Sequence, residues 1–487
     1  MFRDTIELKV DLLKSILILI LILSHLFSNE DLTIHKKNVL ILAPQQNSEY
    51  LKISKSLTNI LASKSIELGR FNVIDRNQIK TIMEEQELQM SGMISDRDIV
   101  EIGEFASADD ALLINIITFD QQGVPKKKKK ENDEDEDSSL IEWVIKTSIN
   151  AKINTIIPSI KYPNNIQTIL QIEIRMLNIE SGVSSNSFQI SSEHTGGTKK
   201  ASLKKTFEKI SWQISKNLRS FYLISSEVIE KNGDNIIILT GKDLGLEEGN
   251  VFEINSPDRE QTYKNRTIKL PGKSRGLARL ITIGPSTSEA IIIRDWRTIK
   301  PGYKVNEMIY DPTAIDLNIK SIPDSNFALQ LKYWPSPLKK ISNAATIQIG
   351  SLRDSRGYDN AFLELGWETN LSILKLKRLK FFGGFSIPFG YIINSDDDGN
   401  SVYMLTSNCQ LKLGANILTN EKTDIFFDVY YSIANSKSKI WRYNKTKEDD
   451  QGNEVNEQFS ASWDSRGAPS IMRSKISLSL GIRFFDY

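Results

Sequence analysis

The last thirteen residues, Lys475-Ile-Ser-Leu-Ser-Leu-Gly-Ile-Arg-Phe-Phe-Asp-Tyr487, alternate apolar and polar side chains almost without interruption. Successive side chains of a β-strand point to opposite faces, so this run predicts a strand with one apolar face. The alternation recurs upstream, and residues 312–487, about a third of the chain, hold 23 of its 41 aromatic residues. We count eight such strands, at 314–322, 327–334, 344–352, 360–369, 379–393, 402–418, 423–434 and 474–485.

A soluble β-sandwich also alternates, but three features of this region favour an antiparallel transmembrane β-barrel. The apolar face recurs over lengths that can cross a bilayer at a tilt, Trp and Tyr gather near strand ends, and the chain closes on an aromatic residue. That ending, with Gly481, Phe485 and Tyr487, resembles the insertion signal of bacterial outer-membrane proteins. The side chains predicted to face lipid are Leu411, Leu413, Ile425, Phe427, Val429, Leu478, Leu480, Ile482 and Phe484.

The number of strands fixes the orientation of the predicted barrel. If the last strand ends in the periplasm, residues 419–422 form a periplasmic turn and residues 435–473 form a long external loop, the usual asymmetry. Starting at Phe327 and counting 457–463 as a strand would invert this arrangement. Eight strands leave an interior that side chains can fill, so we expect no wide pore.

The amino-terminal residues 1–28 are predicted to be a signal peptide. Residues 16–23 are eight consecutive aliphatic side chains, which suits a signal-peptide core but is too short for a spanning helix. The alternative is an ordinary buried apolar segment. We therefore expect a protein exported to the outer membrane, with its first two thirds in the periplasm.

Composition excludes several classes of protein. The 487 residues carry 62 Lys and Arg against 61 Asp and Glu, a net charge of +1, which gives no basic field for nucleic acid. The single cysteine, Cys409, excludes an internal disulfide, and three histidines are too few for a His-rich metal centre. We expect no cofactor, no metal site and no catalytic residues.

Residues 36–224 show alternating strand and helix patterns, which predict an α/β domain. Short apolar runs at 38–44, 71–75 and 111–119 indicate buried strands. A helical stripe follows the first of these runs, and another closes the domain with Leu203, Phe207, Ile210, Ile214, Leu218 and Phe221.

Residues 70–92, 101–109 and 174–182 resemble the CsgG-like family of curli production assembly/transport components. The resemblance implies an exported periplasmic domain, often ring-forming, that acts at the outer membrane without catalysis. The family motif residues, to which it gives structural or oligomerisation roles, are Phe71, Val73, Asp75, Arg76, Glu84, Gln86, Gly92, Gly103, Asp109 and Gly182.

The chain departs from that family where the secreting members insert apolar membrane hairpins. At the first place stand five lysines, 126–130, followed by the acidic run 131–137, so we predict a solvated loop at 119–140. At the second stands the polar stretch 194–200. This domain is therefore not expected to build the pore of the curli exporter.

Residues 225–310 are predicted to form a small β module, with short strands between turn signals such as Pro301-Gly302. The stretch 243–252 is similar to the C-terminal SH3-like part of the flagellar assembly protein T family, and this resemblance implies an SH3-like β module with a docking or spacer role. A structural linker domain explains the pattern equally well.

Together these patterns predict a non-enzymatic protein that outer-membrane lipid holds through the barrel. Its CsgG-like domain would dock or form homo-oligomers in an envelope assembly or secretion system with protein partners. One alternative is a secretion channel built by a ring of subunits that pool their strands. Another is a barrel-anchored module that binds glycan or peptide.

Overall fold

The computed structural model divides the chain into two compact units. Unit 1 comprises residues up to 224 together with 240–246, and unit 2 comprises residues 225–239 and 247–487. The structure describes residues 32–33, 35–42, 50–74, 96–125, 162–264, 266–321, 327–435, 440–448, 454–471 and 475–487. The predicted signal peptide and most of the charged loop lie outside these residues.

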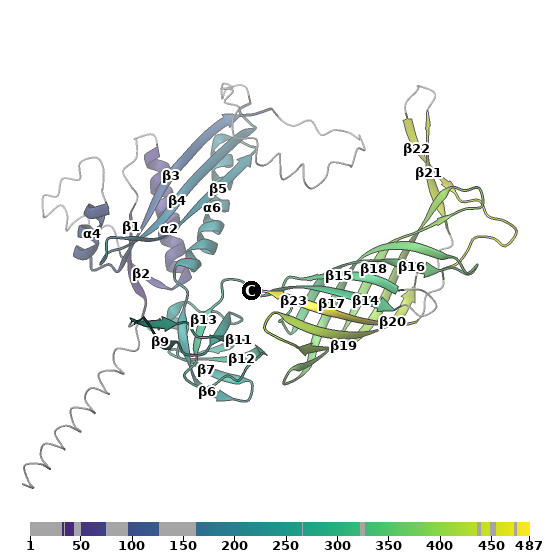
Figure 1. Ribbon diagram of the computed structural model, residues 1–487. Coiled ribbons are helices and arrows are strands. Elements are labelled where there is room, and N and C mark those ends of the chain that lie inside the picture. Colours follow the sequence, from purple (N-terminus) through teal and green to yellow (C-terminus); the bar gives the residue numbers. More distant parts are fainter. Residues whose placement is uncertain are drawn as a thin grey trace, which may run out of the picture. The chain divides into compact units, whose positions relative to one another are not determined.

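Unit 1 is built on a five-stranded sheet in the order β2-β1-β3-β4-β5 (Figure 1). The first pairings are parallel, between β1 (Lys37–Leu42) and both β2 (Phe71–Val73) and β3 (Asp110–Gly123). The later pairings, through β4 (Ile166–Asn178) and β5 (Ser184–Thr195), are antiparallel. The sheet therefore changes from parallel to antiparallel at β3.

Helices supply the two apolar layers against this sheet. One layer holds α2 (Leu51–Leu68) and α6 (Lys199–Phe221), whose buried Leu57, Leu61 and Ile210 pack with Ile172 in one core cluster. A smaller cluster holds α4 (Asp96–Phe105) through Ile99 and Ile102. Within the described residues, no helix is both long and apolar enough to cross a membrane.

The first part of unit 2 is a closed barrel of six short strands in the order β11-β12-β7-β6-β13-β8. Its interior is apolar, with Val228, Ile238, Ile254 and Val305 fully buried. The ribbon β9 (Arg259–Tyr263) and β10 (Arg266–Leu270) is a separate pair of exposed strands. The six strands are β6 (Ser225–Asn232), β7 (Asn235–Ile238), β8 (Val251–Asn255), β11 (Ser274–Ile283), β12 (Ser288–Asp295) and β13 (Lys304–Glu307).

The second part of unit 2 is a closed antiparallel barrel of eight strands, which confirms the eight-strand prediction. The order is β18-β17-β16-β15-β14-β23-β20-β19, and β19 pairs back onto β18 to close it. The strands are β14 (Thr313–Ser321), β15 (Phe327–Trp334), β16 (Ile341–Arg353), β17 (Asp359–Leu376), β18 (Leu379–Ser395), β19 (Ser401–Leu418), β20 (Thr423–Asn435) and β23 (Ile476–Asp486).

The segment predicted to be a long external loop contains a further hairpin. Strands β21 (Arg442–Glu448) and β22 (Glu454–Ser460) pair with each other, and Arg442 also pairs with Tyr403 of β19. The alternative count, which placed residues 457–463 in the barrel, is wrong because β22 pairs only with β21 and β14 takes part in closing the barrel.

Candidate functional site

The outer surface of the eight-stranded barrel is apolar. Along β23 the side chains alternate strictly between exposed and buried, with Leu480 60% and Ile482 43% exposed. The same outward face carries Leu317, Leu331, Leu365 and Phe389 on other strands. A water-facing surface rarely holds so many contiguous apolar side chains, whereas a barrel in hydrocarbon requires them. The barrel is therefore built to stand in a membrane.

The structure places the predicted lipid-facing residues as follows. Eight of them lie on the outer surface with 42–65% of their area exposed, namely Leu411, Leu413, Ile425, Phe427, Leu478, Leu480, Ile482 and Phe484. Val429 shares their strand face but is partly buried. Cys409 is partly buried beside a register shift in β19.

The three residues of the terminal sequence signal have different surroundings. Gly481 lies against the interior, where an added Cβ atom would clash with the Cβ of Asn318. Phe485 is buried, and the ring of Tyr487 stacks at 6.2 Å on that of Trp296. These aromatics therefore pack on protein at the end of the barrel that leads to the six-stranded barrel.

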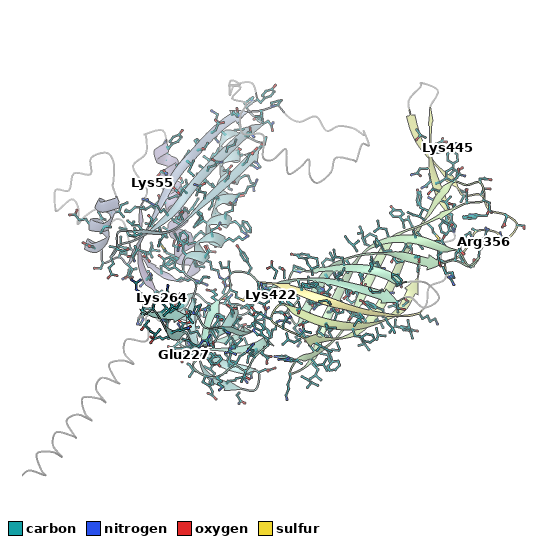
Figure 2. The ribbon with its side chains drawn as sticks, viewed as in Figure 1. Lys55, Glu227, Lys264, Arg356, Lys422 and Lys445 are labelled. Carbon is teal, nitrogen blue, oxygen red and sulfur yellow. The ribbon has the colours of Figure 1, made fainter. Side chains whose placement is uncertain are left out.

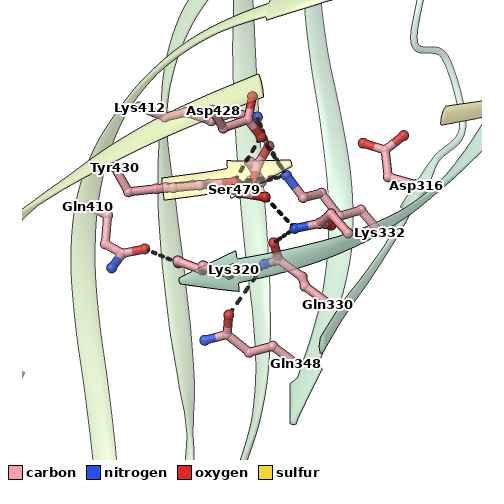
Figure 3. A network of polar contacts seen from close by, with 12 residues as sticks. Asp316, Lys320, Gln330, Lys332, Gln348, Gln410, Lys412, Asp428, Tyr430 and Ser479 are labelled. Carbon is pink, nitrogen blue, oxygen red and sulfur yellow. Dashed lines mark hydrogen bonds and ion pairs between the residues drawn. The ribbon is translucent and has the colours of Figure 1, made fainter. Parts of the chain in front are cut away.

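The interior of the eight-stranded barrel holds buried charges. We call Lys332, Glu368, Lys412 and Asp428 the interior ion quartet; each of these side chains is at most 1% exposed. Figure 3 labels Lys332, Lys412 and Asp428 within this network of polar contacts. Lys332 Nζ lies 3.1 Å from Asp428 Oδ2 and 3.1 Å from Glu368 Oε2. Lys412 Nζ lies 3.0 Å from Asp428 Oδ2 and also pairs with Glu368. Two cations thus meet two carboxylates, which leaves the group neutral.

The contacts of the quartet cross the lumen. Lys332 stands on β15, whereas Asp428 and Tyr430 stand on β20, which is not a neighbour of β15 in the barrel. Lys332 Nζ donates to the Tyr430 hydroxyl at 2.8 Å, and that hydroxyl lies within 3.2 Å of both carboxylates. Side chains therefore block the lumen at this level, as expected for eight strands.

Two further layers fill the interior on either side of the quartet. In one, Arg483 donates two hydrogen bonds to Asp316, at 2.6 and 2.8 Å, and Trp334 Nε1 donates to the same carboxylate at 2.8 Å. In the other, Lys320 Nζ donates to Gln410 at 2.8 Å. The interior is thus polar and contains an extensive hydrogen-bond network, whereas the outer surface is apolar.

The six-stranded barrel closes one end of the eight-stranded barrel. Arg294 of β12 donates to Asp424 at 2.7 Å and to the carbonyl oxygens of Asn420 and Glu421 at 2.9–3.2 Å. Its guanidinium carbon lies 3.9 Å from the centre of the Phe485 ring. Around it, apolar side chains from both barrels form one cluster that includes Leu277, Trp296, Trp334 and Phe485. We call this contact region the seam.

The opposite end of the eight-stranded barrel has its own packing. Figure 2 labels Arg356 at this end and Lys422 at the seam end. Arg356 bonds Asp464 at 3.1 Å, and its guanidinium lies 5.1 Å from the Trp463 ring. Trp463 in turn meets Trp441 edge to face at 5.9 Å. These contacts tie the loops together over this end.

In unit 1 the described motif residues have structural surroundings. The Phe71 ring is buried 4.6 Å from that of Tyr222, and Val73 packs against the same core. Asp109 accepts the backbone N–H of Asn38 at 2.7 Å, which ties β1 to the start of β3. Gly182 turns the chain between β4 and β5 with φ +65°, and an added Cβ atom at Gly103 would clash with the side chain of Ile179. Asp75, Arg76, Glu84, Gln86 and Gly92 lie outside the described residues.

Sequence reasoning missed a buried polar cluster in unit 1. Asp110 is 1% exposed and accepts from the Tyr222 hydroxyl at 2.9 Å and from Lys37 at 3.1 Å. Burial, with the neighbouring Asp110 carboxylate, raises the pKa of Tyr222 well above its usual value. The three residues are far apart in sequence, so no local pattern marked them. The cluster joins β1, β3 and the end of α6, which gives it a structural role.

No group of three or more His, Cys, Asp or Glu side chains suited to holding a metal ion occurs among the residues that the structure covers. In the eight-stranded barrel the buried carboxylates of Asp316, Glu368 and Asp428 are instead paired with Lys, Arg or Trp. The arrangement can stabilise a closed barrel in lipid, and its charged groups are engaged in that packing.

Comparison with known proteins supports part of this interpretation. Residues 35–124 match the family model described as curli production assembly/transport component CsgG, which confirms the resemblance seen in the sequence over that stretch. No curated protein matches the chain. Among solved structures, a major outer membrane protein from Thermus thermophilus is similar at 12% identity and a TM-score of 0.25, covering 36% of this chain and 99% of its own.

Proposed function

We propose that this protein is a non-enzymatic outer-membrane component of an envelope transport or assembly system. In this proposal residues 1–28 direct export, 312–487 anchor the protein in the membrane, and 225–310 form a connecting module. Residues 36–224 then dock onto protein partners, or onto further copies of the chain, in the periplasm. The observation that carries the proposal is the reversed polarity of the eight-stranded barrel, apolar outside and ion-paired inside.

The filled interior supports an anchor more than a channel. The interior ion quartet spans the lumen, and Arg294 with its apolar surroundings covers the seam end. Opening a path for a solute would separate buried ion pairs, which is costly when one partner is left alone. A single barrel of this kind therefore holds the protein in the membrane without conducting.

The match of residues 35–124 supports a role in transport or assembly. The matched family is named for curli production and transport. The barrel would then fix this domain close to the membrane. We infer that docking or oligomerisation, rather than chemistry, is its contribution.

The anchoring role is tested by placing charge on the apolar outer face. Leu413→Arg combined with Leu480→Arg should weaken or abolish outer-membrane assembly, because an arginine at mid-membrane on a barrel's lipid face costs about 2–4 kcal/mol. The measurements are membrane fractionation and heat-modifiable gel migration of the full chain. The matched control is Tyr358→Arg, which changes an exposed side chain in a turn at the far end.

A double variant that assembles as well as the control would contradict the membrane anchor. Recovery of the unaltered full chain from the soluble fraction, with no detergent requirement, would do the same.

A second candidate is a subunit of a secretion channel, favoured by the transport component named in the family match. Because the lumen of the single barrel is filled, such a channel would require a ring of subunits. Conductance after reconstitution, together with rings in electron micrographs, would favour it. Monomers without conductance would favour the anchor.

A further inference from the structure

A cavity of about 820 Å³ lies along the seam, within the volume range typical of small-molecule sites. Residues of the six-stranded barrel, among them Arg275 and Arg297, line one side, and the turns that contain Arg378 and Asn420 line the other. We call this cavity the seam groove.

The groove carries an excess of positive charge. Its lining includes Lys273, Arg275, Arg297 and Arg378 against one carboxylate, Glu421. Within the described part of the chain, none of these four cations forms an ion pair. By contrast, their neighbours Arg294 and Lys375 are engaged by Asp424 and Asp295 at 2.7 and 2.9 Å. The seam therefore pairs some of its cations with carboxylates and leaves those that line the groove without one, although Arg378 also donates to the carbonyl oxygen of Trp296 at 3.4 Å.

Two hydrogen-bond donors in the groove wall lack an acceptor. Arg275 Nε and Ser274 Oγ are both buried atoms without a hydrogen-bond partner in the described structure. The Arg275 guanidinium carbon lies 6.0 Å from the centre of the Tyr303 ring, which orients it. Buried donors are normally satisfied, and a ligand that brings acceptor oxygens into the groove would satisfy these two. Planar guanidinium groups suit the oxygens of a phosphate.

The groove adjoins the lipid-facing surface. Arg378 stands in the tight β17–β18 turn, between Leu376, which is 53% exposed, and Leu379. Leu379 pairs across the strands with both Leu376 and Ile417, and Ile417 is 51% exposed. These three apolar side chains form a row beside the cations. An anion in the groove thus lies where the apolar band ends, which is the level of lipid headgroups.

We propose that the seam groove binds the phosphate of a phospholipid, with Arg275, Arg297 and Arg378 on the headgroup and the acyl chains along Leu376 and Ile417. This inference rests on the proposed membrane location of the eight-stranded barrel. Free phosphate would satisfy the cations equally well, but it would leave the adjoining apolar row unused. A phospholipid therefore matches both the cations of the groove and the apolar row beside it.

The test uses the full chain in detergent, with native mass spectrometry during titration with phosphatidylglycerol. The double variant Arg275→Gln/Arg378→Gln should bind this lipid roughly tenfold more weakly, because each lost guanidinium removes charge-assisted hydrogen bonds. The matched control Arg353→Gln/Arg442→Gln removes two exposed arginines at the opposite end and should bind as the unaltered protein does. A diglyceride with the same acyl chains should not bind.

Equal binding by the double variant and the control would overturn the proposal. Binding of inorganic phosphate as tight as that of phosphatidylglycerol would overturn the assignment to lipid. If the double variant does not fold, Arg297→Gln gives an independent measurement, because this exposed side chain has no ion-pair partner in the described structure.

Failure of the membrane location would be seen separately. In that case the unaltered chain would not float with phosphatidylcholine vesicles, whatever the groove binds. If the unaltered chain and the double variant both float, a difference in titration reports on the groove alone.

Discussion

Unit 2 contains two closed β-barrels of opposite polarity. The six-stranded barrel buries Val228, Ile238 and Ile254 inside, and the apolar side chains on its outside are scattered. The eight-stranded barrel buries Lys332 and Glu368 inside and exposes leucine, isoleucine and phenylalanine along its strands. Backbone hydrogen bonding is closed in both, so what differs is the direction in which the apolar side chains point.

That difference shows which solvent each barrel is built for. An apolar interior is stabilised by removing its surface from water. A barrel with charges inside gains nothing comparable from its core, and its outer surface needs hydrocarbon instead. The two barrels meet at Arg294, which belongs to the six-stranded barrel and donates to carbonyl oxygens of the eight-stranded barrel. The seam is therefore the boundary between the barrel suited to water and the barrel suited to hydrocarbon.

The largest effect on stability is expected from removing one charge from the interior of the eight-stranded barrel. Asp428→Ala leaves Lys332 and Lys412 sharing a single carboxylate and should destabilise the barrel by about 3–5 kcal/mol. Denaturant unfolding in detergent, followed by tryptophan fluorescence, measures this loss. Removing an opposite pair, in Lys412→Met/Glu368→Gln, should cost less because Lys332 keeps Asp428. A similar loss in both variants would show that the charges do not act as a neutral group.

A second test compares the same truncation in the two barrels. Leu280→Ala in the six-stranded core should cost about 2–5 kcal/mol, because this side chain is 2% exposed and its loss leaves a cavity beside Ala290. Leu331→Ala on the outer face of the eight-stranded barrel should cost less, because acyl chains fill the vacated space and only the transfer contribution of roughly 0.8 kcal/mol per methylene remains. Unfolding of each variant against the unaltered chain gives the two values. A larger loss at Leu331 would contradict contact with lipid.

The smallest expected effect is a pH dependence of stability in the six-stranded barrel, which we propose to lie in water. Asp258 accepts a hydrogen bond from Lys304 at 2.9 Å and from the backbone N–H of Gly272 at 2.8 Å, and these bonds hold its pKa below the usual value. The ionised form is therefore favoured by folding, so this stabilisation is present above the usual Asp pKa and is lost as pH falls through the lowered one.

Asp258→Asn should remove that dependence on pH. Hydrogen exchange of β13, corrected for its intrinsic pH dependence, should then show a smaller change below pH 4 than in the unaltered chain, as expected from the usual Asp pKa of about 3.9. The effect is small because the carboxylate is partly exposed and screened by water. An identical acid response in both proteins would show that Asp258 contributes nothing to the pH dependence.

The alternation of the last third was enough to predict eight strands, because a period of two is a local property of the chain. Strand ends were less accurate: β17 continues to Leu376, well beyond the predicted 369, where pairing with β18 sustains it. The β21–β22 hairpin was missed because neither of its strands has a clear apolar face. In unit 1 the predicted domain boundaries stay a prediction.

The candidate sites were much less accessible from sequence. Lys332 is separated by 96 residues from Asp428, and Arg294 by 130 from Asp424. In the sequence, each of these residues is indistinguishable from an ordinary charged strand residue. Its ion-pair partner comes close only in the folded structure. The seam groove likewise depends on the start of β11, the residues that follow β12 and two distant turns coming together.

The sequence by itself determined that residues 312–487 form strands with one apolar and one polar face, because the pleat of a strand turns local order into two surfaces. Only the tertiary structure decided that the polar faces close on one another as neutral ion pairs. It also decided that a second barrel covers one end, because those contacts depend on shear, register and distances that no local pattern contains.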